Sequence, residues 1–179
     1  NPTFNEIVFP AAILQPPFFD PAADLAVNYG GIGGVIGHEM GHGFDDQGRR
    51  FDANGAFRDW WSTEDQEHFT LLAERLVEQF DAYEVLDGLH VNGRLTLGEN
   101  IADLGGLALS QRAHARISAD ANDIDGFSPS QRFFLAHATL WRGHTSEELQ
   151  RTLLQVDPHS QRRLRVVGPL SNMDEFQGA

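Results

Sequence analysis

Two histidines four residues apart, with a glutamate beside the first, are the side chains in this sequence best suited to chemistry. His38, Glu39 and His42 fit the pattern H-E-x-x-H. On a helix, residues at i and i+4 lie on the same side, about 5 to 6 Å apart, so both imidazoles can bind one zinc ion. Glu39 lies about 100° further around the helix, where its carboxylate can take a proton from a zinc-bound water.

The segment around this pattern argues against the alternative that the histidines are ordinary polar residues matched by chance. Residues 24–45 contain seven glycines, which disfavour a helix by propensity. Their apolar residues nevertheless recur on one face at helical spacing, and we predict a buried helix whose glycines permit close approach of a neighbour. Unpaired imidazoles would be costly to bury there, and a metal would supply their partner. The predicted apolar face consists of Ile32, Val35, Ile36, Met40 and Phe44.

A catalytic zinc site usually has three protein ligands and an open position for water, so a third ligand is needed. The chain has no cysteine, which leaves His, Asp or Glu. Glu99 is the candidate, because Glu99 and Asp103 are i and i+4 near the start of a predicted helix, where one carboxylate can bind zinc while the other holds an imidazole. Spacing alone does not decide this, since acidic residues are favoured at any helix N-terminus.

The elements that must position these residues are mainly helices within a single domain. A short apolar, partly β-branched segment over 4–14 predicts one or two strands, with Pro10 favouring a sheet edge. Ser62 followed by Glu64 and Asp65 is typical of a helix start. Further helices are predicted from apolar periodicity, over 24–45, 62–84, 96–117, 128–141 and 146–156, with a short one near Asn172.

Composition excludes two classes of partner. The 13 basic and 26 acidic side chains give a net charge of −13, the wrong sign for binding nucleic acid. No run approaches the roughly 20 apolar residues of a membrane helix, so we expect no membrane contact from this chain. The H-E-x-x-H pattern, which is typical of zinc peptidases, instead points to a peptide substrate.

Four separated motifs extend the pattern beyond the histidines. They are IVFPAAILQPPFF at 7–19, VIGHEMGHGFDD at 35–46, GENIAD at 98–103, and DPHS with RVVG at 157–160 and 165–168. Together they resemble the neprilysin family of zinc endopeptidases over nearly the whole chain. The resemblance implies a thermolysin-like zinc-peptidase lobe, mainly α (α+β), with a short N-terminal β element and about five to six helices.

The resemblance assigns roles around the metal. It implies that Glu39 is the catalytic base and that Asp103 orients a histidine and assists proton transfer. Asp45, on the same helical face as His42, would hold the second imidazole. The zinc ligands would be His38, His42 and Glu99.

Two further roles rest on the resemblance alone. It implies that His159 stabilises the oxyanion of the tetrahedral intermediate and that Arg165 hydrogen-bonds the substrate main chain. From the residues themselves, His159 is a loop histidine, and Arg165 belongs to a solvated cluster with Arg162 and Arg163. The other histidines have no partner at ligand spacing and are predicted to be surface or satisfied polar groups: His68, His90, His114, His137 and His144.

Relatives of this kind are several times longer, so residues 1–179 are expected to be the C-terminal zinc-binding catalytic lobe of a larger metallopeptidase. The missing N-terminal part would be its partner, and without that part we expect weak or no hydrolysis. Family habit implies an extracytoplasmic location: periplasmic, secreted or a membrane-anchored ectodomain.

Two alternatives remain open beside a zinc endopeptidase acting on oligopeptides. The first is a catalytically silent, zinc-stabilised fragment or interaction module, which a fourth protein ligand would favour. The second is another zinc-peptidase subclass such as an aminopeptidase, where the third glutamate follows the second histidine much more closely. Here Glu99 follows His42 by 57 residues (99 − 42), which speaks against that subclass.

Overall fold

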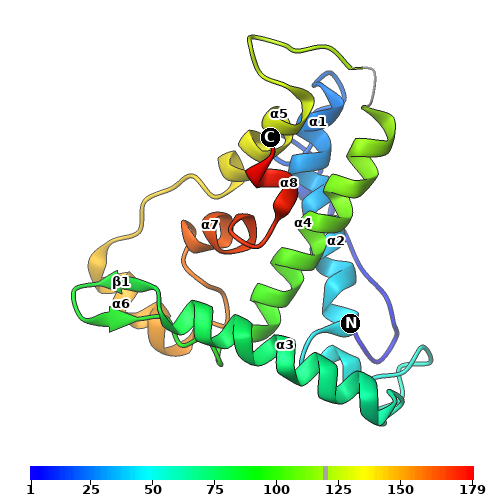
Figure 1. The fold of residues 1–179 in the computed structure, drawn as a ribbon, viewed down its shortest axis with the longest axis vertical. Helices are drawn as coiled ribbons and strands as arrows, with labels where there is room; N and C mark the ends of the chain where they lie inside the picture. Colours follow the sequence, from blue (N-terminus) through cyan, green and yellow to red (C-terminus); the bar gives the residue numbers. More distant parts are fainter. Residues whose placement is uncertain (119–120) are drawn as a thin grey trace.

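The computed structural model describes residues 1–118 and 121–179, and helices dominate it (Figure 1). The mainly helical class is confirmed, and the one sheet of the described residues is a short antiparallel hairpin. None of the described helices is long and apolar enough to cross a membrane. The α-helices are α1 (Leu25–Asn28), α2 (Gly34–Gly41), α3 (Thr63–Asp81), α4 (Leu97–Ile117), α5 (Pro129–Leu140), α6 (Glu147–Val156), α7 (Leu164–Leu170) and α8 (Asp174–Gln177), and the strands are β1 (Glu84–Leu86) and β2 (Leu89–His90).

The predicted helix over 24–45 is present, but it is interrupted. Between α1 and α2 lies a π-helical segment, η2 (Tyr29–Gly33), and after α2 the chain tightens into a 3₁₀ turn, η3 (His42–Phe44). Gly31 has non-helical dihedral angles within η2, and the next amide, of Ile32, donates to the Phe18 carbonyl at 2.7 Å. A Cβ on Gly31 would lie 2.5 Å from that same carbonyl oxygen. Close approach of the N-terminal segment therefore explains this break in the helix.

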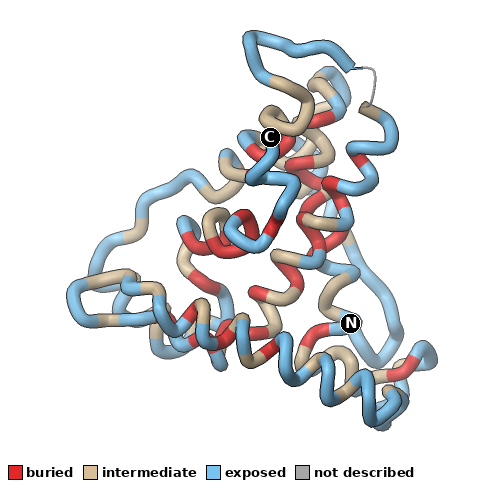
Figure 2. The backbone as a smooth tube through the Cα atoms, viewed as in Figure 1, coloured by how far each residue is buried: buried red, intermediate tan, exposed pale blue. Residues whose placement is uncertain are grey.

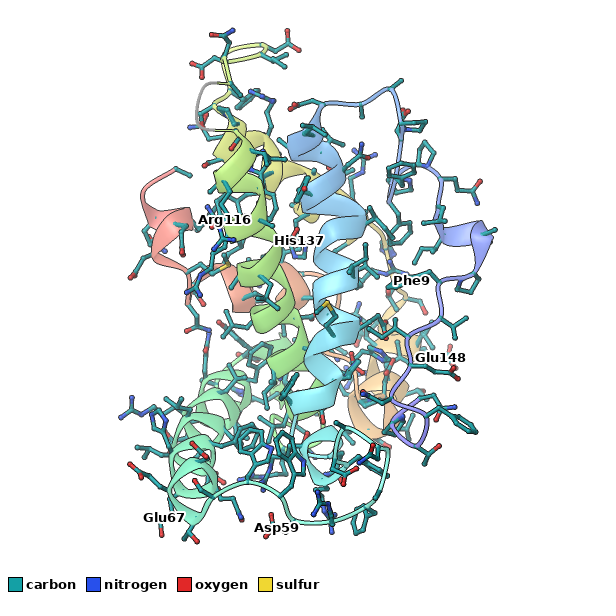
Figure 3. All side chains as sticks on the ribbon, turned by 90° about the vertical axis from the view of Figure 1, so that its right-hand side faces the viewer. Phe9, Asp59, Glu67, Arg116, His137 and Glu148 are labelled. Atoms are coloured by element: carbon teal, nitrogen blue, oxygen red, sulfur yellow. The ribbon has the colours of Figure 1, made fainter. Side chains whose placement is uncertain are left out.

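The predicted buried face of this helix is largely wrong. Ile32 is buried, but Ile36, Met40 and Phe44 are 40%, 52% and 57% exposed. The helix instead buries the side that carries its glycines. α2 and α4 pack side by side (Figure 3), and their backbones approach each other closely at Gly37 and Gly106. A Cβ on Gly37 would lie 2.4 Å from the carbonyl oxygen of Gly106 in α4. Small residues rather than large apolar ones therefore make the helix contact that carries the site.

The predicted N-terminal β element is also wrong. Residues 4–14 form turns and a 3₁₀ turn, η1 (Ala11–Ile13), and most of them are exposed. Backbone hydrogen bonds here are local, such as those from Glu6 to Asn1 and from Ile13 to Pro10. The segment runs along the outer side of α2, where Phe9 is labelled in Figure 3. An extended segment becomes a strand only when another strand pairs with it, and none of the described segments does so here.

The largest cluster of buried apolar residues lies where α1, α4, α5 and α7 meet (Figure 2). The main cluster joins Ala26, Leu107, Phe133, Phe134 and Leu170, and a second packs Leu164 of α7 against Phe80 of α3. The sequence analysis did not predict α7 or the hairpin, whose turn contains Gly88 at a φ of +70°. α7 matters for the site, because it carries Arg165 into the interior at 9% exposure, which makes the solvated-cluster reading of Arg165 wrong.

Candidate metal centre and active site

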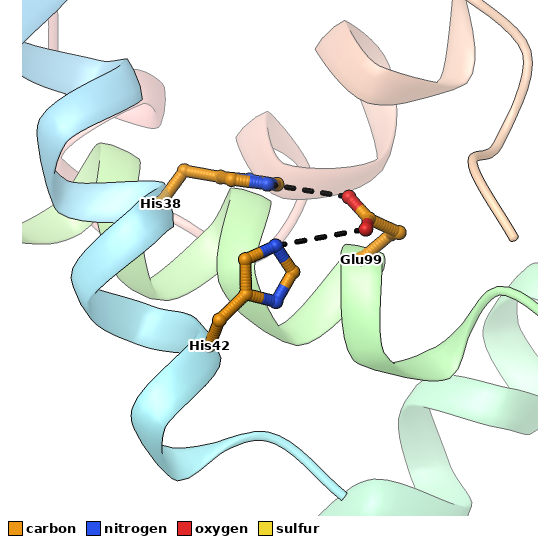
Figure 4. A group of neighbouring side chains, drawn as sticks. All are labelled: His38, His42 and Glu99. Atoms are coloured by element: carbon orange, nitrogen blue, oxygen red, sulfur yellow. Dashed lines mark ion pairs between the residues drawn. The ribbon is translucent and has the colours of Figure 1, made fainter. Parts of the chain in front are cut away.

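Three side chains predicted to bind metal converge between α2 and α4 (Figure 4). His38 comes from α2, His42 from the first position of η3, and Glu99 from the first turn of α4. The His38 Nε2 atom lies 3.2 Å from Glu99 Oε2, and His42 Nε2 lies 3.6 Å from Glu99 Oε1. One donor atom from each of the three lies within 4.8 Å of the others, a spacing that fits a single metal ion.

The chemistry of these donors fits zinc. Two imidazoles and a carboxylate are a common ligand set for catalytic zinc, and the group formed by the described residues contains no fourth protein donor. Glu99 Oε2 is buried and makes no hydrogen bond of good geometry, although nitrogen atoms of His38, His159 and Arg165 lie 3.2 to 3.5 Å away. A buried carboxylate oxygen that accepts no well-formed hydrogen bond is costly, and a cation at this position would compensate for it.

Each of the two candidate ligand imidazoles has an aspartate carboxylate beside its Nδ1 atom, in addition to Glu99 near its Nε2. His38 Nδ1 lies 2.8 Å from Asp103 Oδ1, and His42 Nδ1 lies 2.8 Å from Asp45 Oδ2. The Asp45 carboxylate is itself held by the backbone amides of Gln47 and Gly48, at 2.8 and 2.6 Å. A carboxylate at Nδ1 favours the tautomer whose Nε2 lone pair is free for metal. Both aspartates therefore lie where the sequence analysis predicted them.

These carboxylates control the protonation of the histidines in the metal-free chain. Burial by itself would lower the pKa of His38, but the Asp103 and Glu99 carboxylates outweigh burial and raise that pKa to about 9. Asp45 likewise raises the pKa of His42, against the effect of burial. For Asp103, burial would raise the pKa, and the neighbouring His38 and Arg165 instead hold it below its usual value. Asp103 is therefore a carboxylate at neutral pH.

Arg165 binds Asp103 rather than lying free. Its Nε and Nη2 atoms donate to the two Asp103 oxygens, both at 2.7 Å, and the pair is buried. Below the guanidinium lies the Trp141 ring, with Cζ 4.1 Å from the ring centroid. The Nε2 atom of His137 lies 3.2 Å from the backbone carbonyl oxygen of Arg165, within hydrogen-bonding distance. Sequence reasoning missed Trp141 and His137 as supports for Arg165, and no local pattern signals them.

His159 approaches the metal ligands from the loop between α6 and α7. Its Nε2 atom lies 3.3 Å from Glu99 Oε2, and its side chain is 45% exposed. Asp157 Oδ1 accepts hydrogen bonds from the His159 backbone amide at 2.9 Å and lies 2.8 Å from its Nδ1. The sequence analysis missed Asp157, although an aspartate two residues before the histidine was a signal that could have found it. His159 is thus oriented in the same manner as the two ligand imidazoles.

Glu39 is exposed and lines the same hollow as His38, His159 and Arg165, a cavity of about 220 Å³. Apolar side chains also line this hollow, among them Phe18, Val35, Leu107, Leu140 and Trp141. A second hollow of about 240 Å³ is lined by Arg49, Arg50, Phe57, Arg58, Asp59 and Gln66, none of which belongs to the metal cluster. The first hollow is therefore the candidate active site.

The other histidines divide into two groups. His68, His90 and His144 are exposed, as predicted. His114 and His137 are buried, at 2% and 5% exposure, and the Nδ1 of His137 has no hydrogen-bond partner among the described residues. The prediction of a satisfied polar group is thus wrong for this nitrogen. Burial lowers the pKa of both, which keeps them neutral at physiological pH.

Comparison with known proteins identifies the family. The model of peptidase family M13 matches residues 1–179, the whole chain. The chain belongs to peptidase family M13, the neprilysin family. The resemblance found in the motifs is therefore confirmed.

Several M13 relatives share close similarity with this chain. It is 46% identical to human endothelin-converting enzyme 1, covering 98% of this chain and 23% of that protein. It is 43% identical to neprilysin-3 of Drosophila melanogaster, again over 98% of this chain and 23% of that protein. The crystal structure of zinc metalloprotease Zmp1 of Mycobacterium tuberculosis with an inhibitor superposes at a TM-score of 0.95 with 48% identity, covering 100% of this chain and 28% of that one. This M13 chain thus spans about a quarter of the length of the relatives it matches.

Proposed function

We propose that the chain is the zinc-binding catalytic lobe of a longer metalloendopeptidase that hydrolyses peptide bonds in oligopeptides. The observation that carries this proposal is the open group of His38, His42 and Glu99, with the Glu39 carboxylate lining the hollow beside it. An open three-ligand site is typical of catalytic zinc, whereas structural zinc usually has four protein ligands. For this reason the silent, zinc-stabilised module is the less favoured alternative.

The roles proposed for the side chains follow from their charges and positions. A zinc ion held by His38, His42 and Glu99 would supply Lewis-acid chemistry, polarising a carbonyl and acidifying a water. Glu39 would accept the proton of the attacking water and pass it to the leaving amine. His159 would donate to the developing oxyanion from the exposed edge of its ring.

Arg165 has room for a substrate contact beside its structural one. Nε and Nη2 are engaged with Asp103, which leaves Nη1 as the nitrogen available for a peptide carbonyl. The guanidinium lines the active-site hollow together with Glu39 and His159. Asp103 would then serve both neighbours, holding the imidazole of His38 and fixing the plane of Arg165.

The apolar wall of the hollow supports a preference for a large apolar side chain next to the scissile bond. Its volume of about 220 Å³ is below the roughly 300 to 1,000 Å³ of pockets for drug-sized ligands. One side chain would fill it. Hydrolysis by this chain alone is expected to be weak, because the rest of the substrate cleft would come from the N-terminal part of the longer protein, its proposed partner.

A location outside the cytoplasm is part of the same proposal. It is supported by the family relationship, which includes a mouse relative named membrane metallo-endopeptidase-like 1, 42% identical to this chain. Nucleic acid is excluded from the proposed partners because the net charge is −13.

Zinc content and peptide hydrolysis measured on the same set of variants test the proposal. Wild-type protein should hold one zinc per chain by elemental analysis, Glu99→Ala should lose it, and Glu39→Gln should retain it while losing hydrolysis of a quenched fluorescent oligopeptide. Glu78→Gln, an exposed glutamate on α3, is the matched control and should change neither quantity. Undiminished hydrolysis by Glu39→Gln would sink the proposal, as would a zinc-free wild-type protein after reconstitution.

A further inference from the structure

A buried hydrogen bond ties the loop that carries His159 to the helix that carries Glu99. Ser160 Oγ donates to Asn100 Oδ1 at 2.7 Å across 60 residues of sequence. Ser160 is 4% exposed and Asn100, on α4, is 2% exposed, although Pro158 and His159 beside Ser160 in the loop are exposed. A buried polar contact in an otherwise exposed loop fixes where that loop sits.

The tie lies directly next to two residues of the active site. Asn100 follows Glu99 on α4, and Ser160 follows His159. The His159 side chain is 45% exposed, and its Nε2 lies 3.3 Å from Glu99 Oε2. Asp157 fixes the rotation of this ring but belongs to the same loop, so it cannot fix the loop relative to α4. The Ser160–Asn100 bond does so.

The side-chain amide of Asn100 is hydrogen-bonded at both of its ends. Thr96 Oγ1 donates its hydrogen to the Asn92 carbonyl at 3.2 Å, so it can only accept from Asn100 Nδ2, at 2.9 Å. Asn100 Oδ1 is therefore left to accept from Ser160. The chain of bonds gives each buried group a partner, and removal of the Ser160 hydroxyl leaves Asn100 Oδ1 without a donor.

We propose that Ser160 and Asn100 are positioning residues that hold His159 at a fixed position relative to Glu99, and so relative to the metal. This inference rests on the proposed peptidase function. The tie acts through His159, not on the substrate, so its loss lowers turnover more than substrate binding. Zinc binding is unaffected, because no ligand is displaced.

A double-mutant cycle on the zinc-loaded protein separates this role from general support of the fold. Ser160→Ala is expected to lower kcat about tenfold with KM changed less than about twofold and zinc content unchanged. In a His159→Ala background the same substitution should change kcat by less than about twofold, since the residue it positions is gone. Independent, multiplicative effects of the two substitutions would overturn the proposal.

Ser110→Ala is the matched control for the cycle. Ser110 is also buried, at 5% exposure, and donates to the Tyr29 carbonyl at 2.6 Å across 81 residues, but it lies on a different part of α4. Whatever its own effect on kcat, that effect should be the same in the wild-type and His159→Ala backgrounds.

Hydrogen exchange of the metal-free chain tests the tie without activity. Ser160→Ala should speed exchange in peptides covering residues 157–160 and leave α4 peptides unchanged, whereas Ser110→Ala should leave the loop unchanged. If the longer protein that contains this chain hydrolyses no peptide, the proposed function fails, while exchange in the metal-free chain still decides on the tie. Unchanged exchange in the loop of Ser160→Ala would overturn it.

Discussion

Arg165 and Asp103 form a buried, two-point ion pair, Nε to Oδ2 and Nη2 to Oδ1, each at 2.7 Å. The pair joins α7 to α4 directly behind the His38 imidazole. It has a geometry that a lysine cannot reproduce, because an ammonium has no planar fork of donors.

We therefore expect Arg165→Met to lower the free energy of unfolding of the metal-free protein by about 1 to 3 kcal/mol, since Asp103 loses its two hydrogen bonds from Arg165 while the protonated His38 still faces it. Arg165→Lys should recover only part of this loss. Urea denaturation measures both. A lysine variant as stable as wild type would show that charge alone matters here and that the two-point geometry does not.

Zinc binding should depend steeply on pH. In the metal-free chain the pKa of His38 is about 9, so protons occupy its metal-binding nitrogen at neutral pH, and the pKa of His42 is also raised. Zinc must displace them, and the apparent affinity should rise by about tenfold per pH unit from His38 alone until the pH reaches about 9. Chelator competition across this range measures the slope.

A control for the pH slope is Asp103→Asn, which removes a carboxylate that raises the pKa of His38. The rise in affinity should then level off at a lower pH than in wild type, although the affinity itself falls with loss of the supporting carboxylate. An apparent zinc affinity that is flat between about pH 6.5 and about pH 9 in the wild-type protein would contradict the proton displacement.

The sequence predicted which residues meet at this site better than it predicted the packing around them. His38 and His42 could be placed from spacing, because i and i+4 on a helix is a local relationship. Spacing made Glu99 a candidate but could not decide it, since Glu99 lies on a different helix, 57 residues after His42 (99 − 42), and the family resemblance assigned it as a ligand. Trp141 supports Arg165 only because α5 and α7 meet in space, which no local pattern encodes.

The packing of α2 shows why the burial prediction was wrong. Large apolar residues predict which face of a helix is buried only if the helix packed against it lies at the usual interaxial distance of about 8 to 10 Å. Gly37 and Gly106 bring the two backbones closer than that, so the glycine side is buried and Met40 is exposed. The N-terminal strands were wrong for a related reason, because pairing is decided by a partner and not by the segment itself.

Acid should destabilise the fold through its buried histidines. Burial lowers the pKa of His137 and of His114, so the unfolded chain takes up their protons near pH 6.5 while the folded chain does not. Because the unfolded state then binds more protons, stability falls as pH drops below about 6.5. His38 and His42 do not add to this loss, since histidines with raised pKa values keep their stabilising effect below that pH.

His137→Gln tests this loss of stability in acid, because glutamine keeps a donor for the Arg165 carbonyl but does not titrate. The fall in unfolding free energy between about pH 7 and about pH 5 should be smaller in His137→Gln than in wild type, whatever the difference in stability between the two proteins at pH 7. Carboxylates with lowered pKa values lose their effect only at more acid pH, so they do not mask it. The same loss of stability in acid in both proteins would show that His137 is not its source.

The contact between Gly106 and α2 makes the strongest prediction about how the fold holds the metal site. A Cβ on Gly106 would lie 2.2 Å from the His38 backbone nitrogen, so Gly106→Ala must push α4 away from α2 and move Glu99 from His38 and His42. We expect a loss of about 1 to 3 kcal/mol in unfolding free energy and a marked loss of zinc affinity. Urea denaturation and zinc titration measure the two effects.

The neighbouring Gly105 provides the control on the same helix turn. It is exposed, and a Cβ there would meet nothing within 4 Å, so Gly105→Ala should stabilise the helix by about 0.5 to 1 kcal/mol and leave zinc binding intact. The two alanines differ by one position and should have opposite signs. If Gly106→Ala bound zinc as tightly as Gly105→Ala, the close approach of α2 and α4 would not be what brings the three metal ligands together.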